Sequence, residues 1–186
     1  MASLASRSFD RAAPYYDRTR RLPAAAAAEL TGVLAGELVG RGECLEIGVG
    51  TGRVALALHE AGVSMTGIDL SEAMMAVLVE KAGGRPPFPL VRGDATALPF
   101  PTGVFGAGVA SHVFHLIPAW REALAELRRV LAPGGLVLSD PGAQESNPIR
   151  AAVLVGADVH RSGSQLVPEA FPPVSYTHLR AHETGR

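Results

Sequence analysis

The chain has 186 residues, of which 47% are hydrophobic and 19% are charged, and its formal net charge at neutral pH is −1. This length and composition predict one soluble globular domain and exclude a disordered chain. The 17 basic and 18 acidic residues argue against nucleic acid or an anionic membrane surface as the main partner, because both bind clustered positive charge. The single cysteine, Cys44, excludes a cysteine-based metal cluster, and no metal site is expected. Without an apolar run of membrane-helix length or a secretory signal, we expect a cytoplasmic protein.

Apolar periodicity and glycine or proline punctuation predict helices and short strands in alternation. Pro14 divides the polar and aromatic segment 9–21 into two expected helical pieces. Further helices are expected at 23–40, 52–62, 71–82, 118–131 and 149–161. Short apolar runs predict strands at 43–48, 64–69, 88–92, 104–111 and 135–140. This alternation predicts an α/β fold with an open, mainly parallel sheet and helices on both faces.

The ends of the first three predicted strands carry the residues that could hold a ligand, since ligands of open parallel sheets bind past the carboxyl ends of the strands. The first strand is followed by three alternating glycines, 48 to 52, which let the backbone approach a ligand with no Cβ between them. Asp69 ends the second strand, where a carboxylate can accept hydrogen bonds from both hydroxyls of a ribose. Asp94 follows the third strand and can accept from an exocyclic adenine amine.

The spacing of the glycines separates two classes of ligand. A dinucleotide-binding enzyme needs G-x-G-x-x-G, and the third glycine of that pattern would fall at Arg53. The chain instead has E-x-G-x-G-x-G from Glu46 to Gly52, and it has no phosphate-loop G-K-[ST]. We therefore expect a nucleoside with a zwitterionic arm as the ligand. An NAD-dependent oxidoreductase is the disfavoured alternative.

Four motifs, LEIGVGTGR, GIDLSEAMM, GDATALPFP and LRRVLAPGG, occur in the order and at the spacing of one known family. From about Phe9 to Asp140 the chain resembles class I S-adenosylmethionine-dependent methyltransferases. The resemblance is to the methyltransferase type 11 group, which includes the ubiquinone and menaquinone biosynthesis C-methyltransferases. It implies a Rossmann-like fold, S-adenosyl-L-methionine as the cofactor, and methyl transfer to a small-molecule acceptor. The acceptor, its attacking atom and the oligomeric state are not indicated by the sequence.

The resemblance implies roles for residues in the first two motifs. Gly48, Gly50 and Gly52 would line the methionine and ribose portion of the cofactor. Glu46 would support the amino group of the methionine arm. Asp69 would bind the ribose hydroxyls.

It also implies roles for residues near the adenine and at the fourth strand. Leu70 would lie against the adenine, and Asp94 and Ala95 would bracket its edge. Ser111, at the end of the fourth strand, would face the amino end of the methionine.

Two further pairs of residues concern the cover of the site and the chemistry. Tyr16 and Arg20 match an N-terminal Y-D-x-x-R element that folds over the cofactor. His112 and His115 are candidates for a general base, although packing or pocket lining is the favoured interpretation. The sulfonium is already a reactive methyl donor, so a base is needed only where the acceptor must lose a proton.

Several features depart from the family or from an ordinary helix or strand. Gly106 stands where the family usually has aspartate, and we expect it to loosen the start of its strand. The family's sheet has seven strands and this chain supplies five, so the last two are expected to be missing and the edge at 136–139 to be open. The pair Arg128 and Arg129 is interpreted as a solvated helix face, and Met74 and Met75 as helix core.

The last segment, residues 174–186, lacks helical or strand periodicity and resembles the translation of a transposase-type sequencing adapter. We expect a methyltransferase domain over residues 1–173, with an N-terminal lid and helix at 1–40 and a cofactor-binding core at 41–141. The tail would be non-native and the domain truncated. A truncated fragment that binds the cofactor without turnover is therefore a second alternative.

Overall fold

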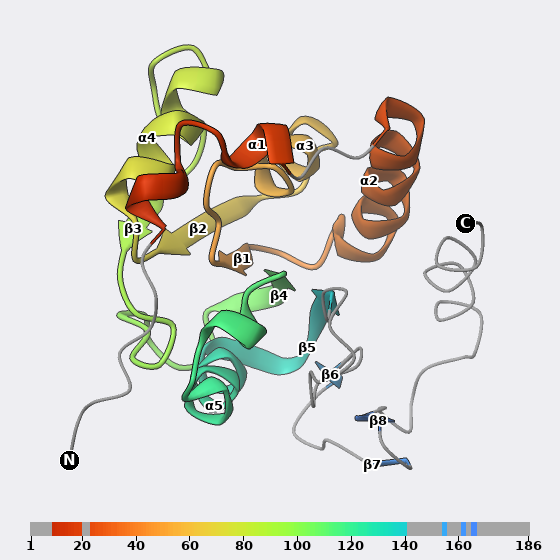
Figure 1. The fold of residues 1–186 in the computed structure, drawn as a ribbon. Helices are drawn as coiled ribbons and strands as arrows, with labels where there is room; N and C mark the ends of the chain where they lie inside the picture. The colour runs from red at the N-terminus through yellow and green to blue at the C-terminus, as the bar shows by residue number, and fades with distance from the viewer. Residues whose placement is uncertain (1–8, 20–22, 141–153, 156–160, 163–164, 167–186) are drawn as a thin grey trace, which may run out of the picture.

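The computed structural model describes residues 9–19, 23–140, 154–155, 161–162 and 165–166. A central sheet carries helices on both of its faces (Figure 1). No helix within these ranges is long and apolar enough to cross a membrane. The tail at 174–186 lies outside the described residues.

Five parallel strands form the body of the sheet, in the order β3-β2-β1-β4-β5. They are β1 (Cys44–Ile47), β2 (Met65–Asp69), β3 (Leu90–Arg92), β4 (Phe105–Ser111) and β5 (Leu131–Asp140). All five predicted strands are confirmed. β5 starts earlier than expected, because Leu131 pairs with Phe105 across a register irregularity. The chain order reverses beside β1, whose neighbours are β2 and β4, and such a switch point opens a crevice at the carboxyl ends of the strands.

Three short strands follow. β6 (Leu154–Val155) pairs antiparallel with β5 at Leu136 and Val137, while β7 (Arg161–Ser162) and β8 (Gln165–Leu166) pair with each other. The expectation of a fully open edge at 136–139 is therefore corrected at two positions. The helix expected at 149–161 is wrong at Leu154–Val155, and most of that segment lies outside the described residues.

The helices also follow the predicted order, with the short helix η2 as an addition that was not predicted. They are η1 (Asp10–Ala12), α1 (Tyr16–Thr19), α2 (Ala24–Leu38), α3 (Ala55–Glu60), α4 (Glu72–Lys81), η2 (Phe114–Leu116) and α5 (Trp120–Val130). Pro14 separates η1 from α1, as predicted. Ser71 caps α4, because its Oγ accepts a hydrogen bond of 3.1 Å from the amide of Met74.

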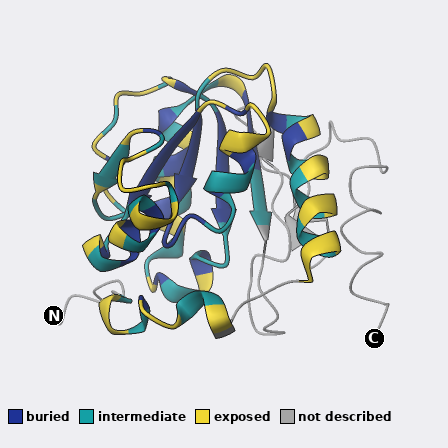
Figure 2. Ribbon diagram, turned by 90° about the horizontal axis from the view of Figure 1, so that it is seen from above, coloured by how far each residue is buried: buried dark blue, intermediate teal, exposed yellow. Residues whose placement is uncertain are grey.

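Two apolar clusters, one on each face of the sheet, hold these layers together. On one face α2, α3 and α4 bury Leu38, Leu58 and Leu78 completely. On the other face α5 buries Leu127 and Val130 against the same strands. Figure 2 shows the strands as the most buried layer, between helices whose outer faces are exposed. Because side chains alternate across a parallel sheet buried on both faces, its strands are mostly apolar, and Glu46 and Thr66 are buried polar exceptions in β1 and β2.

Gly106 allows a close backbone crossing at the start of β4. A Cβ at this position would lie 1.5 Å from the carbonyl oxygen of Arg41. The amide of Gly106 donates to the carbonyl of Glu43 at 2.9 Å. Gly106 thus lets the chain before β1 pack tightly on β4, which corrects the expectation that it loosens the strand.

Arg129 is a structural clamp, so its interpretation as part of a solvated face is wrong. Its guanidinium donates to both carboxylate oxygens of Glu126 at 2.7 Å and to the carbonyls of Leu98 and Phe100 at 2.9 and 2.8 Å. Glu126 also accepts from the amide of Leu98 at 2.8 Å. The hydrogen bonds and charge of Arg129 lower the pKa of Glu126. The pair fastens the loop that follows β3 to α5.

Candidate functional site

A cavity of about 90 Å³ lies at the carboxyl ends of β1, β2 and β4, where the strand order reverses. Nine of the eleven residues predicted to bind the cofactor line it. They are Tyr16, Glu46, Gly48, Gly50, Asp69, Leu70, Asp94, Ala95 and Ser111. Of the other two, Gly52 is not among the lining residues, and Arg20 lies outside the described residues. Segments far apart in the sequence therefore meet at one place, although their roles toward a ligand stay predictions.

The glycine loop after β1 turns through three left-handed residues. Gly48, Gly50 and Gly52 have φ of +69°, +52° and +75°, a region that favours glycine. A Cβ on Gly48 would lie 2.6 Å from Cγ2 of Val113, so the loop packs directly against the segment after β4. Gly52 instead packs under α4, where a Cβ would lie 2.6 Å from Cγ of Leu78.

Replacing Gly52 with alanine is expected to destabilise the fold more than the same change at Gly62. Both have a left-handed φ, +75° and +90°, so the backbone cost is shared. Only Gly52 also has a neighbour within 3 Å of the added Cβ, since Gly62 faces open space. Overpacking at Gly52 should lower the free energy of unfolding by about 1–3 kcal/mol beyond the loss at Gly62. Urea denaturation of the two variants measures the difference, and equal losses would contradict the packing role.

Asp69 ties the glycine loop to the start of α4. Its Oδ2 accepts from the amide of Gly50 and its Oδ1 from the amide of Ser71, both at 2.8 Å. Burial raises the pKa of this carboxyl, while the amides of Ser71 and Gly50 oppose the rise and Asp10 adds to it. The two backbone donors hold the carboxylate in one orientation at the cavity wall. Its remaining acceptor capacity is available to a ligand.

Glu46 is a carboxylate at the base of the cavity, with only 2% of its surface exposed. Its Oε2 has no hydrogen-bond partner among the described residues. Burial raises its pKa to about 8, although the guanidinium of Arg53 and the amide of Ala55 favour the ionised form and Asp69 disfavours it. A buried polar atom without a partner calls for an explanation. A cationic donor bound in the cavity would supply one.

Asp94 serves the loop and the cavity together. Its Oδ1 accepts from both the amide and the hydroxyl of Thr96 at 2.9 Å. That oxygen therefore satisfies donors of its own loop. The residue also lines the cavity beside Ala95, which is buried.

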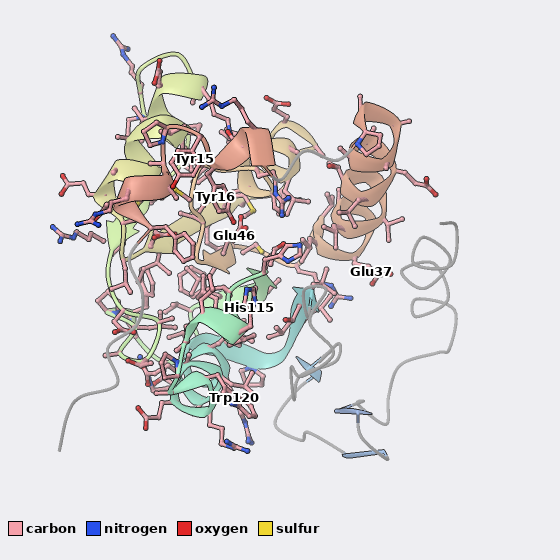
Figure 3. All side chains as sticks on the ribbon, viewed as in Figure 1. Tyr15, Tyr16, Glu37, Glu46, His115 and Trp120 are labelled. Atoms are coloured by element: carbon pink, nitrogen blue, oxygen red, sulfur yellow. The ribbon has the colours of Figure 1, made fainter. Side chains whose placement is uncertain are left out.

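The end of β4 distinguishes the two candidate bases. His112 lines the cavity next to Ser111 and Val113, and it has a φ of +51°. It is the one described residue other than glycine with a positive φ, and such backbone conformations concentrate at functional sites. His115 belongs to η2 (Figure 3). It is exposed and is not among the lining residues. Geometry therefore favours His112 over His115 as a group that meets a ligand.

The N-terminal segment closes one side of the cavity. Phe9 and Tyr16 both line it, and their rings meet edge to face with centroids 6.2 Å apart. Tyr16 of α1 and Glu46 of β1 lie at the same end of the sheet (Figure 3). Tyr15 is 47% exposed. Of the two adjacent tyrosines, Tyr16 is therefore the one at the cavity.

Sequence reasoning missed several lining residues, namely Phe9, Thr51, Arg53, Met74, Val113, Leu116 and Ile117. Met74 was interpreted as helix core alone, and it is both buried and part of the cavity wall. The local signal for these positions was only their apolar character or their place near the glycine loop. Their common location depends on how α4 and η2 pack against the sheet.

The chain is similar to known methyltransferases in sequence and fold. Residues 45–139 match a family model described as "Methyltransferase domain". A demethylmenaquinone methyltransferase of Thermus thermophilus is 40% identical over 94 residues, which are 49% of this chain and 43% of that protein. A phosphatidylethanolamine N-methyltransferase of Cereibacter sphaeroides is 36% identical over 114 residues, 59% of this chain and 56% of that one. The structure of the CcbJ methyltransferase of Streptomyces caelestis has a TM-score of 0.56 at 28% identity, over 70% of this chain and 55% of that one. The chain thus spans about half the length of these relatives.

Proposed function

This chain belongs to the class I S-adenosylmethionine-dependent methyltransferase family, and from that premise we propose that it transfers a methyl group from S-adenosylmethionine to a small-molecule acceptor. The observation that carries the proposal is the buried Oε2 of Glu46, which has no partner among the described residues and lies in a cavity that Asp69 also lines. The two carboxylates match two groups of hydrogen-bond donors on the cofactor, its ammonium and its ribose hydroxyls.

The ammonium of the methionine arm fits the base of the cavity. It carries several N–H donors and a positive charge, and Glu46 has a buried acceptor oxygen with no protein donor. Burying a carboxylate is costly unless a charge or donor compensates it. We propose that Glu46 holds this ammonium.

The ribose fits Asp69. Its two oxygens are already oriented by the amides of Gly50 and Ser71, and each carboxylate oxygen can accept more than one hydrogen bond. A pair of vicinal hydroxyls supplies two donors to such a carboxylate. The buried Ala95 and the neighbouring Leu70 offer apolar contacts for the adenine, beside the carboxylate of Asp94.

The bound cofactor would supply a methyl group on a positively charged sulfur, which makes the methyl electrophilic. The chain's own part is to orient and to exclude water. The glycine loop lets the backbone approach, and Phe9 and Tyr16 cover the cavity. His112 is placed where it could take a proton from an acceptor that must lose one.

The acceptor is not determined by the residues shared with the family. By their names, the two relatives act on demethylmenaquinone and on the nitrogen of phosphatidylethanolamine, although both are similar to this chain, at 40% and 36% identity. We propose a small molecule rather than nucleic acid, because the net charge is −1. The cytoplasmic location and the division into a domain at 1–173 and a non-native tail stay predictions.

Calorimetric titration of S-adenosylhomocysteine into the full chain tests the proposal, with NAD titrated in parallel. We expect micromolar binding of S-adenosylhomocysteine and no heat from NAD. A folded chain that binds NAD and not S-adenosylhomocysteine would overturn the cofactor assignment.

Turnover is tested separately by release of S-adenosylhomocysteine from S-adenosylmethionine in the presence of a quinol or an ethanolamine phospholipid. Cofactor binding without release for any acceptor of the panel would favour the alternative of a fragment that binds the cofactor without turnover.

A further inference from the structure

The N-terminal cover, residues 9–18, lies between the cavity and solvent. Phe9 and Tyr16 of this segment line the cavity, and Ala13, which lies between them in the sequence, is buried. A ligand in the cavity would therefore be in contact with the cover. How firmly the cover is held should then decide how quickly a ligand enters and leaves.

One polar cluster fastens the cover to the glycine loop. Asp17 of α1 accepts a hydrogen bond of 2.6 Å from the hydroxyl of Thr51 through Oδ1. Its Oδ2 accepts from the ammonium of Lys81 at 2.9 Å. The same ammonium donates to the carbonyl oxygen of Thr51 at 2.6 Å. Three elements, the cover, the glycine loop and the last residue of α4, thus converge on one carboxylate.

A second contact fastens the other end of the cover. Asp10 of η1 accepts a hydrogen bond of 2.5 Å from Oγ of Ser71. The amide of Ser71 donates to Asp69, the carboxylate proposed to hold the ribose. The cover is therefore attached at two places, to the glycine loop through Asp17 and to the start of α4 through Asp10.

The interactions of Asp17 are weak enough for the cover to open. The side chains of Lys81 and Asp17 are 36% and 35% exposed, so water screens their attraction. Burial disfavours the ionised Asp17, but the hydrogen bonds from Thr51 and Lys81 outweigh it and lower the pKa of this carboxyl. Asp17 is therefore ionised near neutral pH.

We infer that Asp17, Thr51 and Lys81 form a latch that holds the N-terminal cover closed and sets the rate of cofactor exchange. The inference rests on the proposed function, because the exchanging ligand is the cofactor of that same cavity. Asp17 and Lys81 do not touch the ligand in this proposal. They are positioning residues, because they hold the cover against the glycine loop.

The latch predicts a kinetic signature. The latch forms without a ligand. It therefore favours the closed state of the free protein and of the bound protein alike. A ligand can enter only the open state and leave only through it, and opening both states by the same factor leaves their ratio unchanged. Loss of the latch should therefore raise the association and dissociation rate constants together, with little change in Kd.

The variants Lys81→Met and Asp17→Asn test this by surface plasmon resonance, with S-adenosylhomocysteine over the immobilised full chain. We expect each variant to raise both rate constants about fivefold to tenfold, with Kd changed less than threefold. The double variant should add little to either single change, because both remove the same cluster. Glu72→Gln is the matched control, since it breaks an ion pair of α4 with Arg92 that is 79% and 68% exposed and that includes no residue of the cover.

Lys81 is the only lysine of the chain, which permits a second measurement. Mass spectrometry can follow the acetylation of Lys81 by acetic anhydride. We expect Lys81 to be acetylated more slowly in the unaltered chain than in the Asp17→Asn variant. Equal reactivity, or unchanged rate constants in folded variants that still bind, would overturn the latch and leave the proposed function intact. Failure of the unaltered chain to bind S-adenosylhomocysteine would instead overturn the proposed function.

Discussion

Replacing Asp69 with alanine is expected to weaken the binding of S-adenosylhomocysteine about a hundredfold. In the proposed complex this carboxylate accepts two hydroxyl donors, and hydrogen bonds to a charged group contribute more than neutral ones. A hundredfold change in Kd corresponds to about 2.8 kcal/mol. Calorimetric titration of the variant and of the unaltered chain measures the change.

The matched control is Glu43→Ala, which directly precedes β1 and lies at the opposite end of the strands from the cavity. Glu43 also accepts two hydrogen bonds, from the hydroxyls of Ser64 and Thr66 at 2.7 Å, and it is not among the cavity-lining residues. The two variants therefore each lose one carboxylate and two hydrogen bonds within the protein. Similar affinities in both variants, with unfolding midpoints that show both are folded, would contradict the role of Asp69.

The Glu46→Gln variant is expected to lose a large pH dependence of stability. In the folded chain the pKa of Glu46 is about 8, against an ordinary value of 4.5. Below pH 4.5 both folded and unfolded states hold the proton. Between the two pKa values only the folded state holds it, so the free energy of unfolding falls as the pH rises, and the loss is complete above pH 8. Its size is at most on the order of 5 kcal/mol.

Urea denaturation at pH 5 and pH 8 measures this dependence. The unaltered chain should lose stability between the two pH values, and Glu46→Gln should lose much less. Glu72→Gln, which removes an exposed carboxylate, should behave as the unaltered chain does. A slope that is the same in all three chains would show that Glu46 does not titrate in this range.

Cofactor binding should displace the proton that Glu46 holds in the folded chain. An ammonium beside Glu46 favours its ionised form, so binding of S-adenosylmethionine near pH 7 should release up to one proton. Titrations in two buffers of different ionisation enthalpy detect the release. Glu46→Gln should release none, and its affinity should fall because the charged acceptor is gone.

Much of the fold could be predicted from the sequence, because its signals are local. Glycines and prolines mark the turns, short apolar runs mark strands buried on both faces, and Ser71 marks the start of α4. The site was predictable in outline for a related reason. Parallel strands present their carboxyl ends at one edge, so Glu46, Asp69 and Asp94 had to approach one another once the strands were known.

Only the tertiary structure decided the contacts between residues that no periodicity relates. Lys81 meets Asp17 across 64 positions of the chain, and Arg129 reaches the carbonyls of Leu98 and Phe100. The cost of a side chain at Gly106 depends on the path of the backbone at Arg41. Sequence patterns report which face of an element is buried, whereas such contacts depend on the distances between elements after packing. The sequence alone therefore determined the family, the order of the strands along the chain and the edge that carries the site. Packing determined how that site is covered and what holds the cover in place.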